Sequence, residues 1–327
     1  MDKSFLVFLI SAVASILVGP WVIGVLTRLK VRQTISEDAP ESHKTKQGTP
    51  TMGGLIILFG VIVGVLVVWR LHSQPENHFT LPILLLILAF GGLGLLDDYL
   101  IIKRGKNLGL KARQKLLGQF LLAIGFMAWV YVIRQHNQTE VFFGSTGVDF
   151  GWAYYPLAVL LIVAMSNAVN LTDGLDGLVS GLMVSVAPVT GAMASMVLGG
   201  PGLETLGMTI GGACLGFLWH NGNPAKIFMG DTGSLALGAG IAGLAIAGKC
   251  EFLFLLISLI FIFEALSVII QVISFKATGK RVFKMTPIHH HFELSGWPEQ
   301  RIVIRSWVLQ LLIGIAVLLA WTYLQWH

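Results

Sequence analysis

Charged residues are scarce in this chain. Only 12% of its 327 residues are Asp, Glu, Lys or Arg, whereas 55% are hydrophobic, and the mean hydropathy is +0.78. A soluble protein carries about 25% charged residues, so this composition argues against a soluble globular fold. The polar stretches between the apolar segments are too short to form a second, soluble domain. We therefore expect one integral membrane domain over residues 1–327.

Cysteine is nearly absent as well. Cys214 and Cys250 are the two cysteines, and their separation matches no metal-binding spacing. We expect both to be small, buried apolar residues rather than a disulfide or a metal pair. The net charge of +5 suits a nucleic-acid binder, but membrane proteins collect basic residues in cytoplasmic loops. We therefore expect no nucleic-acid partner.

Long apolar runs are abundant instead. A membrane-spanning helix needs about 20 mostly apolar residues. The chain has ten such segments: 4–27, 51–70, 80–98, 115–134, 154–171, 177–198, 203–220, 232–248, 251–275 and 302–325. The first run continues too far for the apolar part of a signal peptide, so we expect an uncleaved helix there. The predicted fold class is an all-α polytopic membrane protein with about ten transmembrane helices.

The basic residues predict an orientation. The loops that follow odd-numbered spans hold 18 Lys and Arg residues, whereas the opposite side holds 4. Lys and Arg concentrate on the cytoplasmic side of membrane proteins. We therefore predict that the odd-numbered loops are cytoplasmic and that both termini are extracytoplasmic.

Five acids lie at the edges of apolar segments on this predicted cytoplasmic side: Asp97, Asp98, Asp173, Asp176 and Asp231. Carboxylates next to a bilayer are costly and usually mark a functional site. Four of the five have a glycine within three residues, and glycine lets the backbone approach a ligand closely. This combination indicates an active site for an anionic, metal-bound ligand at the cytoplasmic face.

The pair Asp97 and Asp98 ends the third predicted span. Adjacent side chains on a helix point about 100° apart, so the two carboxylates cannot chelate one ion equally well. We expect separate roles, with one serving a metal or phosphate and the other a proton. A solvated helix end is the alternative.

A second group is Asn167, Asn170 and Asp173, which recur every three residues and share one face of a helix. The chain then continues as Gly174-Leu175-Asp176-Gly177. The glycines let the backbone approach a ligand or break the helix. A simple turn is the alternative for this run.

Residues 221–234 form the richest polar loop. The loop offers the Asp231 carboxylate for Mg²⁺, the Asn221 amide for a base, and the Phe228 ring for stacking. Mg²⁺ prefers oxygen ligands and often joins one or two carboxylates to substrate phosphates. A helix-capping role for Asp231 is the alternative.

Three histidines in a row, His289, His290 and His291, lie in a long basic loop. Three successive side chains cannot all point one way, and neither HExxH nor paired cysteines accompany them, which disfavours a zinc site. Contact with phosphate or proton transfer is the interpretation that we favour. A solvated polar loop is the alternative.

Two further polar groups adjoin or interrupt the spans. Lys46 and Thr51 lie in a glycine-rich stretch that resembles a phosphate-contacting loop, although it lacks the P-loop pattern and also fits an ordinary basic flank. Glu264 lies within the ninth predicted span, with Gln271 on the same helix face. We expect these two to brace the bundle as a buried polar pair, with a substrate contact as the alternative.

Seven stretches together resemble the polyprenyl-phosphate N-acetylhexosamine-1-phosphate transferases. They are KTKQGTPTMGG (44–54), GLLDDY (94–99), GLKARQK (109–115), SNAVNLTDGLDGL (166–178), FLWHNGNPAKIFMGDTGSLALG (217–238), EALSVIIQV (264–272) and MTPIHHHFELSGW (285–297). Within this superfamily the chain is most similar to the phospho-N-acetylmuramoyl-pentapeptide transferase branch. The MTPIHHHFEL segment separates that branch from those that accept plain UDP-GlcNAc.

The resemblance implies a reaction, its partners and a location. Undecaprenyl phosphate would attack the β-phosphate of UDP-N-acetylmuramoyl-pentapeptide, giving lipid I and UMP with Mg²⁺ as cofactor. This is the first membrane step of peptidoglycan synthesis. The resemblance further implies a multi-pass homodimer in the bacterial cytoplasmic membrane, with residues 1–327 as one transferase domain. Phosphoryl transfer depends mainly on positioning and charge neutralisation, which agrees with clustered acids at one face.

Residue roles carried over from the family divide into two sets. The implied catalytic residues are Asp97, which would deprotonate or orient the lipid phosphate, Asp98 in support, Asp231 as the Mg²⁺ ligand, and His289. The implied substrate-binding residues are Lys46, Thr51, Lys115, Asn167, Asn170, Asp173, Gly174, Asp176, Asn221, Phe228, Gln271 and His290. Among these, Asp176, Gly174, Asn221 and Phe228 would form the uridine pocket.

Two rival functions stay open. A transferase of the same superfamily that uses UDP-GlcNAc would share the fold and chemistry. A secondary transporter would place polar groups near the bilayer midplane on broken helices, whereas these acids cluster at one face. An intramembrane aspartyl protease would need glycine at position 228, where this chain has Phe228.

Overall fold

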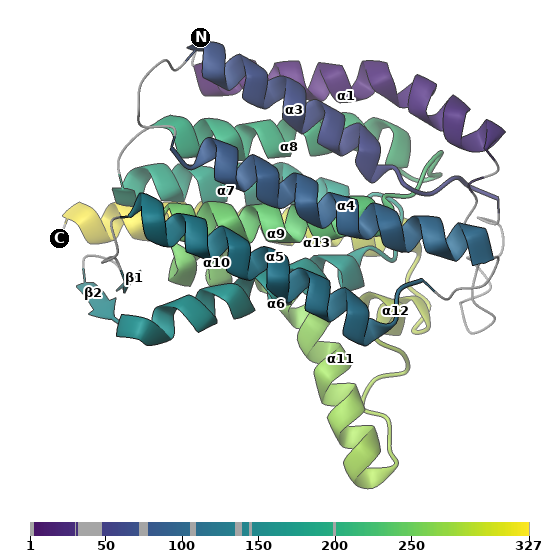
Figure 1. Cartoon of the computed structure of the whole chain (residues 1–327). Coiled ribbons are helices and arrows are strands. Elements are labelled where there is room, and N and C mark those ends of the chain that lie inside the picture. Colours follow the sequence, from purple (N-terminus) through teal and green to yellow (C-terminus); the bar gives the residue numbers. More distant parts are fainter. Residues whose placement is uncertain are drawn as a thin grey trace.

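The computed structural model of the chain describes residues 3–29, 31, 48–71, 78–104, 109–134, 139–143, 146–198 and 201–326. Within these ranges the regular elements are helices, apart from one short hairpin (Figure 1). The elements are α1 (Lys3–Arg28), α3 (Gly54–Leu71), α4 (Thr80–Arg104), α5 (Ala112–Ile133), β1 (Glu140–Phe143), β2 (Thr146–Asp149), η2 (Gly151–Ala153), α6 (Tyr154–Thr172), α7 (Leu178–Leu198), α8 (Pro201–Asn221), α9 (Gly230–Ala247), α10 (Glu251–Ile257), α11 (Leu259–Thr278), α12 (Ile288–Glu293) and α13 (Glu299–Trp326).

Each of the ten predicted segments falls on a long helix, except that the ninth is divided into α10 and α11. Among the described residues, eight helices are long and apolar enough to cross a membrane: α1, α4, α5, α6 with η2, α7, α9, α11 and α13. The described apolar part of α3, Gly54–Val67, is shorter, and α8 is not one of the eight. The polytopic helical fold is therefore confirmed, and the count of ten spans stays a prediction.

Helix α9 forms the centre of the bundle. Every residue from Thr232 to Ala247 is buried, and α9 lies against α3, α4, α6 and α7. Its small residues permit this close packing: a Cβ on Gly238 would lie 2.5 Å from the Met165 carbonyl oxygen, and one on Gly240 would lie 2.6 Å from Ile87. Small residues at helix contacts are how helices approach closely in lipid. The innermost helix thus carries Asp231 in its first turn.

The ninth predicted span is broken at Ser258. Its backbone (φ −96°, ψ 15°) departs from helical values and separates α10 from α11. The side chain of Gln310 in α13 donates to the Ile257 carbonyl at 2.8 Å, beside the break. After the break, α11 leaves the bundle and projects away from the other helices (Figure 1). The prediction of one continuous helix over 251–275 was therefore wrong.

Helix α1 contains Pro20 in its interior. Proline has no backbone N–H, so the carbonyl four residues earlier, that of Ile16, loses its helical donor. His220 at the end of α8 lies 3.1 Å from this carbonyl oxygen through Nε2 and satisfies it. Gly19 makes room, since a Cβ there would lie 2.1 Å from the same ring nitrogen. A side chain of α8 thus supplies the hydrogen bond that Pro20 removes from α1.

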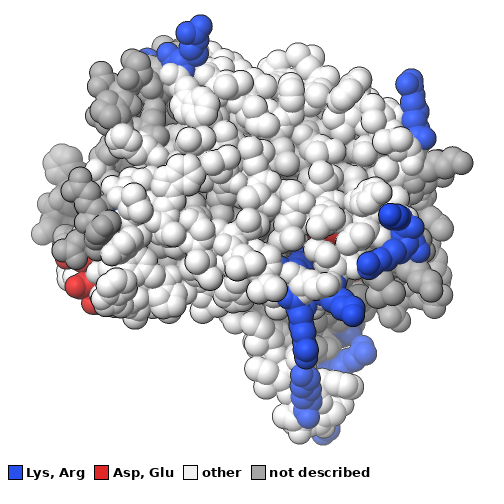
Figure 2. All heavy atoms as spheres, in the orientation of Figure 1, with Lys and Arg blue, Asp and Glu red and all other residues white. Residues whose placement is uncertain are grey.

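The helix ends gather into two groups. We call the group with the C-termini of α4 and α6 and the N-termini of α5 and α9 the acid end, because Asp97 and Asp231 lie there. The opposite group is the hairpin end, where β1 and β2 pair antiparallel, with Glu140 opposite Asp149. This hairpin is the one described exception to the all-α prediction. Figure 2 shows most visible Lys and Arg side chains over the acid end and the tip of α11, with a broad uncharged middle.

Candidate active site

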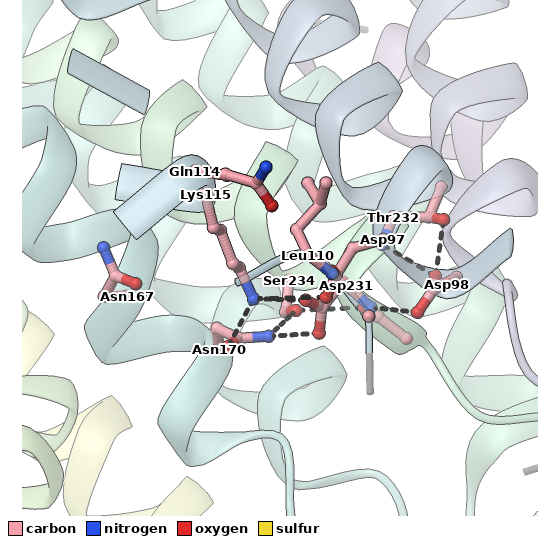
Figure 3. A network of polar contacts seen from close by, with 12 residues as sticks. Asp97, Asp98, Leu110, Gln114, Lys115, Asn167, Asn170, Asp231, Thr232 and Ser234 are labelled. Carbon is pink, nitrogen blue, oxygen red and sulfur yellow. Dashed lines mark hydrogen bonds and ion pairs between the residues drawn. The ribbon is translucent and has the colours of Figure 1, made fainter. Parts of the chain in front are cut away.

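Asp231 lies at the centre of a polar cluster at the acid end (Figure 3). Its Oδ1 accepts a hydrogen bond from Asn170 Nδ2 at 2.7 Å, and its Oδ2 is in direct contact with Lys115 Nζ. The same ammonium group lies 3.7 Å from Asp97 Oδ2 and 3.5 Å from Asn170 Oδ1. Four helices thus bring two carboxylates and an amide oxygen around one cation. All four belong to the site residues that the resemblance implies, and the structure brings them together.

Asp97 and Asp98 occupy different surroundings, as their adjacency predicts. Asp97 Oδ1 accepts from the backbone N–H of Leu110, just before α5, and its other oxygen faces Lys115. Both acids are buried, with 6% and 5% exposure. Neither ends its helix, because α4 continues to Arg104. The alternative of a solvated helix end is therefore wrong.

Asp98 caps the first turn of α9. Its Oδ1 accepts from the Asp231 backbone N–H at 3.1 Å, and its Oδ2 accepts from the N–H and the hydroxyl of Thr232 at 3.1 and 2.7 Å. The first N–H groups of a helix have no internal partner, and a negative charge there is favoured by the helix dipole. Since Asp98 provides the cap, the Asp231 side chain is free of that task. The alternative in which Asp231 caps its own helix is therefore wrong.

Asn167 and Asn170 lie on one side of α6 but have different partners. Asn170 Nδ2 also donates to Ser234 at 2.9 Å, which ties α6 to the first turn of α9. Asn167 exchanges hydrogen bonds with the amide of Gln119 in α5, with Nδ2 donating at 2.7 Å. In Figure 3 it lies apart from the cluster around Asp231. Asn170 therefore meets the acids directly, whereas Asn167 joins α5 to α6.

Asp173 follows α6 and is half-buried. Burial, together with the nearby charges of Asp231, Asp98 and Asp176, raises the pKa of its carboxyl to about 8. A hydrogen bond from the Gly230 backbone opposes this shift. Carboxylates that crowd together resist ionising together unless a cation neutralises them. The acid end therefore favours the binding of a second cation, in addition to the ammonium group of Lys115.

The Gly174–Gly177 run is held by side chains of the 221–234 loop. Asp176 Oδ2 accepts from the Ala225 backbone N–H at 3.1 Å and from Asn223 at 3.3 Å. Asn221 Oδ1 accepts from the Gly177 backbone N–H at 3.1 Å. The two loops of the predicted uridine pocket are thus connected. In the structure, Asp176 and Asn221 fix the loop backbones, and their contact with a nucleotide stays a prediction.

Phe228 joins the 221–234 loop to the chain before α3. Its backbone N–H donates to the Pro50 carbonyl at 2.9 Å and its carbonyl accepts from Gly53 at 2.8 Å, while the side chain is half-buried. Gly230 has φ +72°, and a Cβ there would lie 2.6 Å from Asp98 Oδ2 and 2.9 Å from Thr51 Oγ1. Thr51 therefore lies at the edge of the acid cluster. Lys46 lies outside the described residues.

The three histidines have three different partners, so they point in different directions. His289 Nδ1 lies 3.0 Å from Glu264 Oε2, and His290 Nδ1 lies 2.7 Å from Glu293 Oε2. His291 Nδ1 accepts from the Lys284 backbone N–H at 3.1 Å. His289 alone is tied to α11 and packs on Gly174, where an added Cβ would lie 2.3 Å from its Nε2. It is the histidine that adjoins the acid end.

The expected pairing of Glu264 with Gln271 is not found. Gln271 Oε1 accepts from the backbone N–H groups of Val282 and Phe283 at 2.9 and 3.0 Å, and its Nε2 donates to the Phe283 carbonyl at 2.9 Å. Both residues lie on α11, but the partners of Gln271 lie in the loop that follows it, whereas the partner of Glu264, His289, lies in α12. Gln271 shapes this loop, and its contact with substrate stays a prediction.

Comparison with known proteins identifies the family. Residues 80–249 match the model of glycosyl transferase family 4, and residues 46–58 match signature 1 of the phospho-N-acetylmuramoyl-pentapeptide-transferases. The curated transferase of that name from Halalkalibacterium halodurans is 46% identical over 315 residues, covering 95% of each chain. Those from Moorella thermoacetica (46%, 94% of this chain and 95% of the relative) and Bacillus subtilis (45%, 92% of each) are similarly close.

The chain belongs to the phospho-N-acetylmuramoyl-pentapeptide-transferase family. The matched range 80–249 contains the whole cluster around Asp231, including Asp97, Lys115 and Asn170. The matched range ends before α11, so Glu264 and His289 lie outside it. The similarity to the curated relatives, in contrast, extends over 95% of the chain.

A metal site at the acid end would be incomplete without substrate. Among the residues that the structure describes, no three His, Cys, Asp or Glu side chains converge as a metal cage. The atoms around Lys115 Nζ are nevertheless carboxylate and amide oxygens, and oxygen atoms are the ligands that hard cations prefer. Mg²⁺ commonly takes one or two carboxylates and completes its shell with phosphates and water. The residues present therefore fit Mg²⁺ bound together with a phosphate ligand.

Four residues that the sequence analysis did not name lie in the candidate site: Gln119, Ser234, Glu299 and Thr232. Glu299 at the start of α13 accepts from the Asp176 backbone N–H at 2.8 Å and so holds the Gly174–Gly177 run. Thr232 and Ser234 lie within one helical turn of Asp231, and Gln119 lies one turn from Lys115, so helical spacing was the available signal. Nothing in the sequence connects Glu299 with Asp176.

Proposed function

We propose that this protein transfers phospho-N-acetylmuramoyl-pentapeptide from UDP-N-acetylmuramoyl-pentapeptide to undecaprenyl phosphate, releasing UMP and forming lipid I. Membership of the family and the names of its relatives support the reaction. The observation that carries it within the structure is the convergence of Asp97 and Asp231 on Lys115 at one end of an apolar helix bundle. Such a site can receive a lipid phosphate from the bilayer and a nucleotide from water.

The chemistry exchanges one phosphoanhydride for another. An oxygen of the lipid phosphate attacks the β-phosphorus, and the bond from that phosphorus to the bridging oxygen breaks, so that UMP leaves. Asp97 faces Lys115 and has one oxygen accepting from Leu110, which suits it to orient the lipid phosphate and to accept its proton. Whether it instead attacks as a nucleophile is a separate question for trapping experiments.

Lys115 and Asn170 are suited to hold phosphate oxygens. The ammonium of Lys115 and the amide of Asn170 both contact Asp231, and either can turn to an incoming anion. Phosphoryl transfer gains most from such positioning and from charge neutralisation. We assign Mg²⁺ to Asp231, where, when bound, it would neutralise charge on the transferred phosphate.

We further propose that the acid end faces the cytoplasm of a bacterium and that the whole chain acts in its cytoplasmic membrane. The distribution of 18 Lys and Arg residues against 4 supports this orientation. Tyr131, Trp152 and Tyr155 cluster at the hairpin end, with ring centroids 5.4 to 6.3 Å apart. Such rings collect at membrane–water interfaces. Homodimer formation stays a prediction from the resemblance, to be tested by sizing in detergent.

The deciding experiment is UMP release by the full chain purified in detergent. Undecaprenyl phosphate and Mg²⁺ are supplied with either UDP-N-acetylmuramoyl-pentapeptide or UDP-GlcNAc. We expect UMP from the pentapeptide substrate alone, and none after EDTA. Release from UDP-GlcNAc instead would assign the protein to the sister branch. If folded protein releases no UMP from either substrate, the proposal is overturned. If UMP release continues after EDTA is added, the Mg²⁺ assignment is overturned.

A further inference from the structure

Glu264 has a role that its position within an apolar helix does not suggest. It lies in α11, six residues after the break at Ser258, and is 5% exposed. We infer that Glu264 is a positioning residue that holds the His289 ring so that Nε2 faces the reacting groups. This inference rests on the proposed function, because His289 acts on the substrates of that reaction.

The hydrogen bonds of Glu264 determine which ring nitrogen of His289 carries hydrogen. Glu264 Oε2 accepts from the His289 backbone N–H at 3.3 Å and lies 3.0 Å from Nδ1 of the same residue. An ionised carboxylate can only accept hydrogen bonds. Nδ1 therefore donates to Glu264, and Nε2 is left as the acceptor. A carboxylate behind an imidazole fixes both the tautomer and the ring orientation in this way.

The other nitrogen of His289 points toward the site. Nε2 is buried and has no hydrogen-bond partner within the described parts of the chain. A Cβ on Gly174 would lie 2.3 Å from it, so Nε2 lies directly over the backbone next to Asp173. Buried polar atoms in native proteins almost always have a partner. The atom that completes this one is expected to be a hydrogen-bond donor on the substrate or on an ordered water beside it.

The neighbouring histidines do not substitute for this arrangement. The His290 ring centroid lies 4.2 Å from that of His289, but its Nδ1 is 2.7 Å from Glu293 within α12. His291 faces Lys284. Within the described residues, Glu264 is thus the carboxylate paired with the histidine that reaches Gly174.

Steady-state kinetics separate positioning from packing. We would measure kcat, and KM for both substrates, by UMP release for wild type, Glu264→Gln, Glu264→Ala, His289→Ala and the Glu264→Ala/His289→Ala double variant. Ser267→Ala is the matched control, because Ser267 is buried on the same helix and donates to the Glu264 backbone carbonyl at 2.7 Å. Melting temperatures in detergent verify that each variant is folded.

We expect either single change at Glu264 to lower kcat about tenfold to hundredfold, the usual effect of removing a partner behind a functional histidine. Both KM values should stay within about twofold, and the control should match wild type. The double variant should be no slower than His289→Ala, because Glu264 acts through that ring.

Two results would overturn the inference: wild-type kcat in both Glu264 variants, or an equal loss from Glu264→Ala with and without His289. Failure of the proposed function looks different. In that case wild type itself releases no UMP from UDP-N-acetylmuramoyl-pentapeptide.

Discussion

The two ends of the helix bundle both bury charge, but they balance it in different ways. At the acid end, Asp97 and Asp231 lie around one ammonium group, that of Lys115. At the hairpin end, two cations, Arg134 and Lys249, accompany one carboxylate, that of Glu251. Among these interior groups, negative charge is in excess at the acid end, and positive charge is in excess at the hairpin end.

Both cations of the hairpin end have contacts within the protein. Arg134 Nη2 donates to the carbonyls of Ile246 and Ala247, the last residues of α9, at 2.8 and 2.7 Å. Lys249 Nζ donates to the Glu140 carbonyl at 2.9 Å and lies 3.8 Å from the centre of the Tyr154 ring. Cations are favoured at helix C-termini by the helix dipole. These contacts join the hairpin-end cations to the C-terminus of α9, to β1 and to α6.

Helix α9 connects the two ends, and its own ends explain the difference. Asp98 from α4 caps its N-terminus, and Arg134 from α5 caps its C-terminus, each with the sign of charge that the helix dipole favours. After these caps are assigned, the acid end still holds Asp97, Asp173 and Asp231. These carboxylates cap neither end of α9, and they are the ones available to a metal and a phosphate.

The largest expected effect is that of Asp231→Asn. It removes the charge at the centre of the acid end but keeps the shape, and transfer should fall by about 10²-fold or more, as when a preorganised electrostatic group is lost. UMP release measures it. Asp149→Asn at the hairpin end is the matched control and should leave the rate unchanged, because Asp149 is exposed. Near-normal rates for Asp231→Asn would remove the distinction between the two ends.

Arg134→Met tests the opposite end. It removes two buried hydrogen bonds from the C-terminus of α9, so we expect a loss of about 2–4 kcal/mol in stability. The kcat of the folded fraction should not change. Thermal unfolding in detergent, with Arg70→Met as an exposed control, measures the loss. A lower kcat at unchanged stability would contradict a purely structural role for the hairpin end.

Most of the helices could be predicted from the sequence because a bilayer demands apolar segments of a set length. Most predicted edges lie within three residues of the observed helix ends, as for 154–171 against Tyr154–Thr172, whereas α4 runs on to Arg104 past the predicted end at 98. The break at Ser258 was missed, because serine is unremarkable in a helix. What marks the break is Gln310, more than fifty residues away in the chain, beside the Ile257 carbonyl.

The site residues also fall into those that could be predicted from the sequence and those that could not. Asp97, Lys115, Asn170 and Asp231 were recognisable because acids and amides near a bilayer are costly, and because their motifs resemble a family. The functions of Asp98 as a cap and of Glu264 as the partner of His289 were not. Both depend on which helix ends lie together, and periodicity along one helix carries no information about that. Contacts between residues of different helices could therefore be assigned only from the structure.

Lys249 provides a smaller test, through pH. Burial, together with the charge of Arg134, lowers the pKa of its ammonium group from 10.5 to about 8, although Glu251 opposes the shift. The unfolded chain therefore holds this proton up to a higher pH than the folded protein does. Where the unfolded state binds more protons, stability rises with pH.

Between pH 8 and pH 10.5, wild type should accordingly gain stability relative to Lys249→Met. We expect a gain of about 1–2 kcal/mol in the free energy of unfolding over the first pH unit above 8. Below pH 8 the difference between the two proteins should be constant. The melting temperatures of both proteins across this range measure it, and other titrating groups cancel in the difference. A flat difference would mean that the protein does not penalise this charge, and that the hairpin end accommodates cations without cost.

The smallest expected effect concerns α1, where the His220 side chain replaces a backbone hydrogen bond that the helix lacks, in the interior of the helix rather than at its end. His220→Phe leaves the Ile16 carbonyl without a donor and should cost about 1 kcal/mol. With Pro20→Ala the helix regains its own N–H at that carbonyl, so the same change at His220 should cost much less. A double-mutant cycle in detergent measures the coupling. Equal costs in both backgrounds would mean that His220 stabilises by packing on Gly19, and that Asp98 and Arg134 are alone among these three in completing another helix's backbone.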